Sequence, residues 1–217
     1  MMAELADKVT VNCQSSIRID GTKVIYFDPF GITEESHDAD VILITHEHYD
    51  HFQPESIAKI RKESTVLVAP LSMQGKALKE SGVAAEQCVF LEPKQEKNVA
   101  GLLVETVGAY NKLKPFHLKA KNWLGYIVTL DGVRYYVAGD TDPNEDNRRV
   151  KCDVALVPIG GHFTMDKKQA ADFVANLKPK VAIPTHYGEV VGTPEDGADF
   201  KDYIEIMDAD IQVALKL

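Results

Sequence analysis

The stretch from His46 to His51 reads His-Glu-His-Tyr-Asp-His, and it decides how the rest of the chain is interpreted. It directly follows the apolar run Val41–Ile44, which is typical of a buried β-strand. In extended backbone the side chains of residues i and i+2 point to the same side, so His46 and His48 can bind one ion together. Neutral imidazole is a usual ligand of zinc and of other borderline divalent metals. The stretch therefore predicts a metal site at the end of a strand.

Asp50 and His51 lie past the bend of the same motif and can face a second ion beside the first. The alternative is a solvated or pH-sensitive histidine-rich turn, since short motifs also match by chance. We favour the metal site because the motif stands in the strand-to-loop context that metal binding needs. The chain is expected to be a metalloenzyme.

Composition describes an ordinary globular protein. The chain has 217 residues, of which 45% are hydrophobic and 26% charged, and we expect a single domain over residues 1–217. No apolar run approaches the roughly 20 residues of a membrane-spanning helix, so no membrane is expected as a partner. The net charge of −9 argues against general affinity for nucleic acid. The oligomeric state is not predicted.

The cysteines point to a reducing compartment. Cys13, Cys88 and Cys152 show no close pairing, and buried free thiols are the expected state. The first ten residues carry Glu4 and Asp7 and no apolar core of a signal peptide. We therefore expect the protein to be cytoplasmic.

Local signals place hairpins and helices along the chain. Asp20-Gly21 and Asp131-Gly132 each stand between two β-branched or aromatic runs and predict hairpin turns. A helix is predicted over Pro54–Glu63, with proline in its first turn. Two sheets with helices on the outside fit these elements better than a doubly wound parallel sheet does.

Two further strand ends supply candidate ligands. Asp140 follows the strand predicted over Val133–Ala138, and its carboxylate can bridge two ions. His186 follows the strand predicted over Val181–Ile183. Taken alone, Asp140 would be a turn residue bonded to its own backbone, and His186 a surface or core histidine. Their recurrence at strand ends favours the ligand role.

Taken in their order along the chain, these motifs resemble the metallo-β-lactamase superfamily of metal-dependent hydrolases. The resemblance covers about residues 9–217 and rests on Asp28-Pro29-Phe30, the His46–His51 motif, Gly139-Asp140-Thr141 and His186. The segments Pro158–Met165 and His186–Gly188 are similar to a compact branch that includes ascorbate-6-phosphate lactonase-like proteins. The resemblance implies an α/β (α+β) fold, an αββα sandwich of two mixed β-sheets flanked by helices. It also implies a dinuclear site, usually of zinc, at one edge of the sheets.

The resemblance assigns the ligands to two ions. Family members commonly have a histidine where this chain has Asn111; we assign the role to His117, because an asparagine carbonyl is a poor zinc ligand. The first ion is then held by His46, His48 and His117, the second by Asp50, His51 and His186, with Asp140 between them. Zn²⁺ is favoured, because di-iron relatives carry a carboxylate at the position of His48; Mn²⁺ and Fe²⁺ are the alternatives.

The substrate is predicted from a cluster of lysines. No acidic residue occurs from Val107 to Leu130, whereas Lys112, Lys114, Lys119 and Lys121 surround His117. A local positive patch beside the metals would attract anions, with Lys114 and Lys119 binding the substrate. The alternative is a solvated lysine-rich loop.

Four residues are candidates for catalysis or substrate binding. Asp50 can orient or deprotonate water as well as bind metal. His162 follows two glycines and either contacts the substrate or is a plain loop histidine. Tyr187 either donates to a developing oxyanion or is a packed aromatic. Trp123 either stacks on the substrate or lies in the core.

The leading hypothesis is a zinc-dependent hydrolase that uses a metal-bound hydroxide. Its substrate would be a small anionic molecule, phosphorylated or carboxylated, with an ester, lactone or phosphodiester bond. One alternative is an RNA-processing metallonuclease, which the acidic balance opposes. Another is a non-catalytic metal-binding protein on the same fold, although a purely structural zinc site tends to be closed and rich in cysteine.

Overall fold

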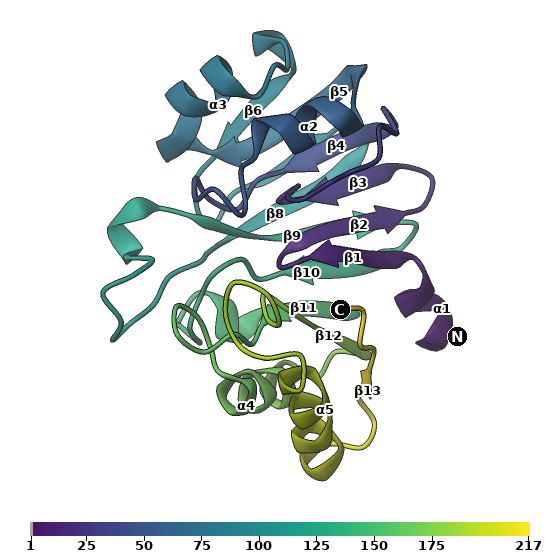
Figure 1. Ribbon diagram of the computed structural model, residues 1–217, viewed down its shortest axis with the longest axis vertical. Coiled ribbons are helices and arrows are strands. Elements are labelled where there is room, and N and C mark those ends of the chain that lie inside the picture. Colours follow the sequence, from purple (N-terminus) through teal and green to yellow (C-terminus); the bar gives the residue numbers. More distant parts are fainter. Residues whose placement is uncertain (1) are drawn as a thin grey trace.

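The computed structural model describes residues 2–217 and consists of two β-sheets that face each other (Figure 1). In the first sheet the strand order is β1 (Val9–Cys13), β2 (Ser16–Asp20), β3 (Val24–Phe27), β4 (Ala39–Leu43), β5 (Arg61–Pro70) and β6 (Cys88–Leu91). In the second sheet the order is β13 (Gln212–Val213), β12 (Val181–Thr185), β11 (Val154–Pro158), β10 (Val133–Val137), β9 (Leu124–Leu130), β8 (Leu102–Gly108) and β7 (Glu96–Val99).

Both sheets are mixed. Strands β1 to β3 are antiparallel and β3 to β6 are parallel; in the second sheet β7 to β10 are antiparallel and β10 to β13 are parallel. The two predicted Asp-Gly hairpins are confirmed, between β2 and β3 and between β9 and β10. Asp131 also joins the hairpins, because its carboxylate accepts hydrogen bonds from the backbone nitrogen of Thr22 at 3.1 Å and from its hydroxyl at 2.6 Å.

Alternation along the strands divides the core into layers. In β4, Val41 and Leu43 belong to the cluster between the two sheets, whereas Ile42 belongs to the cluster outside the first sheet. Successive side chains of a strand point to opposite faces, so one apolar run supplies both layers. Tyr126 of β9 crosses the central layer and donates a hydrogen bond to the carbonyl of Ile44 at 2.7 Å. This contact holds the sheets together just below the histidine motif.

Helices cover the two outer faces. On the first sheet lie α2 (Pro54–Ile60) and α3 (Gln74–Glu80), and on the second lie α4 (Lys167–Leu177) and α5 (Asp196–Met207) (Figure 1). The remaining helices are α1 (Met2–Asp7) and the short 3₁₀ turns at Leu71–Met73, Ala85–Gln87, Lys119–Lys121 and Asn147–Arg149. This arrangement confirms the predicted αββα sandwich of two mixed sheets. No helix of residues 2–217 is long and apolar enough to span a bilayer.

Two elements differ from the sequence prediction. The helix predicted over Pro54–Glu63 ends at Ile60, because Arg61 already pairs with Ala39 of β4. The hydroxyl of Thr65 accepts from the backbone nitrogen of Lys62 at 2.8 Å and holds this part of β5 extended. Strand β7 was not predicted, because its first three residues are polar and exposed and the sequence shows no apolar alternation there.

Candidate metal centre

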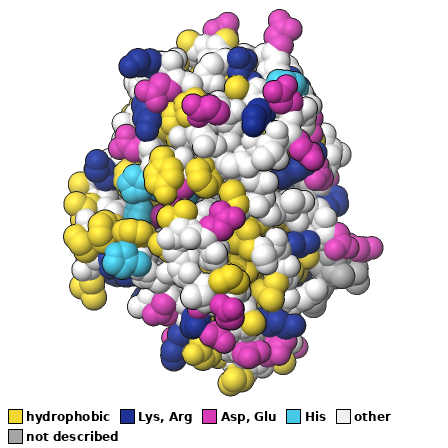
Figure 2. Space-filling view, in the orientation of Figure 1, with side chains coloured by type: hydrophobic (Ala, Val, Ile, Leu, Met, Phe, Trp, Pro, Cys, Tyr) yellow, Lys and Arg dark blue, Asp and Glu magenta, His cyan; other side chains and the backbone are white. Residues whose placement is uncertain are grey.

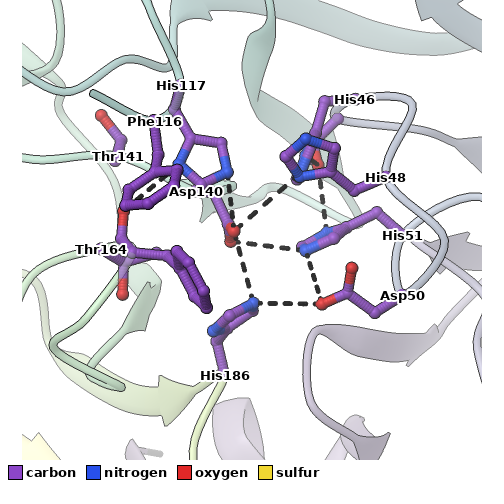
Figure 3. Close-up of polar contacts among 12 residues, drawn as sticks. His46, His48, Asp50, His51, Phe116, His117, Asp140, Thr141, Thr164 and His186 are labelled. Atoms are coloured by element: carbon purple, nitrogen blue, oxygen red, sulfur yellow. Dashed lines mark hydrogen bonds and ion pairs between the residues drawn. The ribbon is translucent and has the colours of Figure 1, made fainter. Parts of the chain in front are cut away.

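Four strands carry the candidate ligands to one edge of the sheets. Asp28 follows β3, the His46–His51 motif follows β4, Asp140 follows β10 and His186 follows β12. His117 comes from the loop between β8 and β9. Figure 3 shows these imidazoles and carboxylates converging from different segments on a common centre around Asp140. Every ligand predicted from the sequence therefore lies within one cluster.

The first ligand group consists of His46, His48 and His117, whose coordinating atoms lie within 4.8 Å of one another. Nε2 of His46 is 3.0 Å from Nδ1 of His48. Two neutral imidazole nitrogens that face each other repel unless a proton or a cation lies between them. The group therefore has the donor atoms and the spacing of a site for a divalent ion.

The second ligand group consists of Asp50, His51 and His186. Oδ2 of Asp50 lies 3.5 Å from Nε2 of His51 and 3.4 Å from Nε2 of His186. Asp140 lies between the groups: its Oδ2 is 3.2 Å from Nε2 of His117 and 3.3 Å from that of His186, and its Oδ1 is 3.4 Å from Nε2 of His51. One carboxylate thus contacts imidazoles of both groups.

Asp140 reaches this position because of the glycine before it. Gly139 has a φ of +65°, and a Cβ there would lie 3.1 Å from the carbonyl of Leu124 and 3.1 Å from Cβ of Thr45. A larger residue would have to push the loop away from β4 and β9. The absence of a side chain at Gly139 therefore allows the close approach of the loop to β4 and β9.

Asp28 supports His51 from behind. Its Oδ2 lies 2.7 Å from Nδ1 of His51, and its carboxylate also accepts from the backbone nitrogen of Thr45 at 2.7 Å and from its hydroxyl at 2.6 Å. Since Nδ1 of His51 faces Asp28, Nε2 is the ring nitrogen that faces Asp50 and Asp140. Sequence reasoning gave Asp28 no site role, although its place directly after a strand was the available signal.

Asn111 supports His117 in a similar way. Its side-chain nitrogen donates to the carbonyls of Phe116 at 3.1 Å and Phe163 at 2.6 Å, which uses both of its hydrogens. Nδ1 of His117, 3.2 Å from the carbonyl of Phe163, is then the donor to that oxygen. This tautomer leaves Nε2 of His117 as the bare nitrogen in the first ligand group. Asn111 itself lies behind the histidine.

Burial and charge set the protonation states. Burial, and then the nearby His51, lower the pKa of His46 well below its ordinary value. Burial acts on His51 in the same direction, but the carboxylates of Asp140 and Asp28 outweigh it and raise the pKa of His51. Burial would raise the pKa of Asp140, but His186 and His51 hold it well below the usual range. Asp140 is therefore an ionised carboxylate in a buried site.

Buried ligand atoms without a hydrogen-bond partner show that the cluster suits a divalent metal ion. Within the described chain, Nε2 of His51, His117 and His186 and Oδ1 of Asp140 are buried and have no hydrogen-bond partner. Buried polar atoms normally have one, because an unpaired group keeps the full cost of desolvation. All four atoms belong to groups that face one another, and imidazole with carboxylate is the donor set of zinc and similar ions.

Three residues of the site adopt a left-handed backbone conformation. Asp28, His117 and His186 have φ values of +44°, +53° and +57°. Residues other than glycine rarely adopt this left-handed conformation, although Asp and His do so more often than most. Each such residue costs on the order of 1–3 kcal/mol, and such strain gathers at functional sites.

Two predicted catalytic residues do not face the cluster. Tyr187 is buried in the hydrophobic layer outside the second sheet, and a Cβ added to Gly197 of α5 would collide with its hydroxyl. The oxyanion role for Tyr187 is therefore wrong, and the packed aromatic is correct. His162 is exposed and packs its ring against Phe116 and Phe163, with centroids 5.9 Å and 4.5 Å apart. A cavity of about 360 Å³ opens above the cluster and is bordered by His48, His117 and His186, among others. His162 does not line this cavity.

The two lysines that were predicted to bind the substrate are paired with acidic residues instead. Lys114 pairs with Asp142 at 2.6 Å and donates to the carbonyl of Thr164, and Lys119 pairs with Glu145 at 3.1 Å. Neither side chain lines the cavity above the cluster. Acidic residues from beyond the loop neutralise the lysines, so the substrate-binding role for Lys114 and Lys119 is not supported by the geometry.

Trp123 lies in the core rather than on the cavity. Its ring is buried against the first ligand group, with centroids 4.7 Å from His46, 4.8 Å from His48 and 5.5 Å from His117. Of the two roles open for Trp123, the structure shows core packing. It is the one tryptophan of the sequence, which makes its fluorescence a reporter of this group.

Comparison with known proteins gives the family. A sequence profile of the β-lactamase superfamily domain matches residues 9–186. A UPF0173 metal-dependent hydrolase of Thermococcus kodakarensis is 32% identical over 206 residues, which cover 89% of this chain and 90% of the relative. The chain belongs to the UPF0173 metal-dependent hydrolases of the metallo-β-lactamase superfamily. A UPF0173 relative from Pyrococcus abyssi is 33% identical over 91% of this chain and 92% of its own.

Solved structures share the fold of this chain. A crystal structure from Parabacteroides distasonis, described as that of a metal-dependent hydrolase, has a TM-score of 0.79 at 28% identity over 96% of this chain and 92% of its own. Igni18, a metallo hydrolase from Ignicoccus hospitalis, has a TM-score of 0.75 at 23% identity over 95% of this chain and 93% of its own. At that identity Igni18 supports the fold alone. The UPF0173 protein is thus a metal-dependent hydrolase with a histidine and aspartate site.

Proposed function

We propose that this UPF0173 hydrolase binds two divalent ions, with Zn²⁺ favoured, and cleaves a small ester, lactone or phosphodiester. The observation that carries the proposal is the position of Asp140. Its Oδ2 lies 3.2 Å from Nε2 of His117, and its Oδ1 lies 3.4 Å from Nε2 of His51. Oδ2 also lies 3.3 Å from Nε2 of His186. A carboxylate that contacts imidazoles of both ligand groups in this way is suited to bridge two ions.

The remaining ligands follow from the two groups. His46, His48 and His117 would hold the first ion, and Asp50, His51 and His186 the second. When bound, divalent ions lower the pKa of water from 15.7 to about 7 and polarise a carbonyl or phosphoryl oxygen. Zn²⁺ is favoured over Mn²⁺ because imidazoles dominate the donor set. It is favoured over Fe²⁺ because His48 stands where di-iron relatives carry a carboxylate.

The chain's own residues would orient the reaction. Burial would raise the pKa of Asp50, but hydrogen bonding to His186 lowers it, so the carboxylate is ionised at neutral pH. Asp50 also lines the cavity, where it can orient the attacking water and accept its proton. Asp28 keeps Nε2 of His51 directed at Asp50.

The cavity limits the substrate to a small molecule. It has a volume of about 360 Å³, which is within the range of small-ligand pockets. Lactones are included because Pro158–Met165 resembles the ascorbate-6-phosphate lactonase-like branch. The anionic preference expected from Lys114 and Lys119 is left out of the proposal, since both lysines are paired with acids.

The alternatives have less support. RNA processing needs free cations along a groove, and the lysines near the site are paired. A purely structural site would be closed, whereas His48 and His117 border an open cavity. The free thiols fit the reducing cytoplasm that we expect to contain the enzyme.

An activity screen with defined metal content tests the proposal. The protein is stripped with a chelator, reloaded with Zn²⁺, Mn²⁺ or Fe²⁺, and assayed with an alkyl ester, a γ-lactone and a phosphodiester. We expect turnover of one class that His48→Ala abolishes while the fold is kept. His37→Ala, an exposed histidine outside the cluster, is the matched control. No turnover of any class by protein that holds two ions would refute the proposed reaction.

A further inference from the structure

The cavity above the metal centre is polar on its floor and apolar on its wall. The floor consists of His48, Asp50, His117, Asp140 and His186. The wall consists of Tyr49, Phe116, Phe163 and Val190, which we call the apolar wall. A pocket with a reactive polar end and an apolar remainder is the usual form of a small-molecule site.

The apolar wall is exposed although its residues are hydrophobic. Tyr49 is 64% exposed, Phe116 38% and Val190 44%. Figure 2 shows hydrophobic side chains gathered beside histidines on this face of the molecule. Single exposed hydrophobic residues are common, but a cluster of them that borders a catalytic group marks a binding site.

The aromatic rings of the apolar wall are held in place. The rings of Phe116 and Phe163 meet edge to face, with centroids 4.9 Å apart at 83°. Tyr49 packs in the same manner on Phe30, at 5.9 Å and 78°. Such pairs add roughly 0.5–1.5 kcal/mol beyond the area they bury, so the wall is largely formed before a ligand arrives.

The apolar wall is also fixed relative to the metal ligands. The side-chain nitrogen of Asn111 bonds to the carbonyls of Phe116 and Phe163, and His117 donates to that of Phe163. The same amide thus holds the two phenylalanines beside His117. An apolar group on this wall lies next to the reacting centre rather than at a distant edge.

No free cation borders the cavity in the described chain. Its lining contains no lysine or arginine. The lysines of the neighbouring loop face away to their own acids: Lys112 and Lys119 pair with Glu145, Lys114 with Asp142 and Lys121 with Glu47. A charged substituent beyond the scissile bond would lose water there without gaining a partner.

We propose that the substrate carries an uncharged apolar group, an aryl or short branched alkyl group, next to the scissile bond, and that Tyr49, Phe116, Phe163 and Val190 bind it. The inference rests on the proposed hydrolase function. It deepens that function by naming the kind of group that the small substrate carries.

Binding of three hydroxamates to zinc-loaded protein tests the proposal by calorimetry. Acetohydroxamate, phenylacetohydroxamate and 3-carboxypropanohydroxamate share a metal-binding head and differ in the attached group. We expect the phenyl compound to bind roughly ten- to hundredfold more tightly than acetohydroxamate, which is the effect of burying one aromatic group. The carboxylated compound should show no gain.

Variants locate the effect on the apolar wall. Phe163→Ala and Tyr49→Ala should bring the phenyl-to-methyl affinity ratio close to one; Tyr49 is exposed, so its loss leaves the core intact. Leu113→Ala, at a 96% exposed position outside the cavity lining, is the control and should keep the ratio. Any of three results would overturn the proposal. They are a phenyl-to-methyl ratio near one in wild-type protein, a ratio that both wall variants keep, and tighter binding of the carboxylated compound than of acetohydroxamate.

Turnover of methyl acetate and methyl phenylacetate separates this inference from the proposed reaction. Hydrolysis of both at equal kcat/KM, with a hydroxamate ratio near one, would overturn the apolar substrate and leave the hydrolase intact. The opposite result is also possible: the protein cleaves no ester, lactone or phosphodiester, yet wild-type protein prefers the phenyl hydroxamate and Phe163→Ala loses that preference. The proposed reaction would then fail, and the apolar site would stand.

Discussion

Oδ2 of Asp28 lies 2.7 Å from Nδ1 of His51, and both side chains are fully buried. The pair explains why a buried imidazole without a hydrogen-bond partner on Nε2 keeps one orientation. Asp28 is anchored in turn by the backbone and hydroxyl of Thr45, the residue just before the histidine motif. Carboxylates behind ligand histidines commonly fix the tautomer and raise the basicity of the ligand nitrogen.

Asp28→Asn should weaken zinc binding about 10- to 100-fold, as loss of such a support typically does. The amide keeps the shape but is neutral and has only one acceptor oxygen for His51 and Thr45. Competition with a chromophoric chelator measures the affinity, and circular dichroism checks the fold. Asp38→Asn removes a carboxylate paired with Arg18 away from the cluster and is the control. Equal affinities for both variants would contradict the supporting role.

Trp123 should report metal binding through its fluorescence. Its ring lies within 4.7–5.5 Å of the three imidazoles of the first ligand group, and the sequence has no second tryptophan. Filling that group changes the charge beside the indole and should shift its emission intensity during a zinc titration. His48→Ala should remove most of the change. An unchanged spectrum in wild-type protein that elemental analysis shows to be loaded would argue against the first ligand group.

Replacing Asn111 and replacing His117 should have different effects on the number of bound metal ions. His117→Ala removes a proposed ligand and should cost one bound ion per chain. Asn111→Ala should retain both ions at an affinity about tenfold lower, because it only loosens the support of His117. Asn176→Ala, whose amide is exposed and bonds to a helix carbonyl, is the matched control. If Asn111→Ala loses an ion and His117→Ala does not, the assignment of the first ligand group is wrong.

Much of the fold follows from local signals in the sequence. The apolar run Val41–Ile44 predicted a buried strand, and the carboxyl end of that strand predicted where the histidines would lie. The turn at Asp131-Gly132 was equally readable, because it depends on neighbours a few residues away.

What the sequence could not supply depends on contacts between distant segments. The lysines near His117 form a positive run in the sequence, but Asp142 and Glu145 neutralise them only in the fold. Tyr187 is adjacent to His186, yet successive residues at a strand end point to opposite sides, and its ring enters the layer below α5. The apolar wall joins four residues from four separate loops, which no sequence period connects.

The cysteines should react slowly in the folded protein. Burial, and then the charge of Glu189, raise the pKa of Cys13 to about 11, and burial with Asp153 raises that of Cys152 to about 12. The reactive thiolate forms only as pH rises through these values, so iodoacetamide at pH 8 should alkylate Cys13 about 100-fold more slowly than in urea, and Cys152 more slowly still. Mass spectrometry of the peptides measures the rates. Equal rates in native and unfolded protein would contradict the burial of these thiols.

In the proposed hydrolase, Asp140 would bridge two metal ions. Native mass spectrometry of metal-free protein reloaded with Zn²⁺ counts the ions on each chain. We expect wild-type chains with two zinc ions and Asp140→Ala chains with fewer. Wild-type protein that saturates at one zinc, with the same single ion in Asp140→Ala, would show that Asp140 does not join two metal sites.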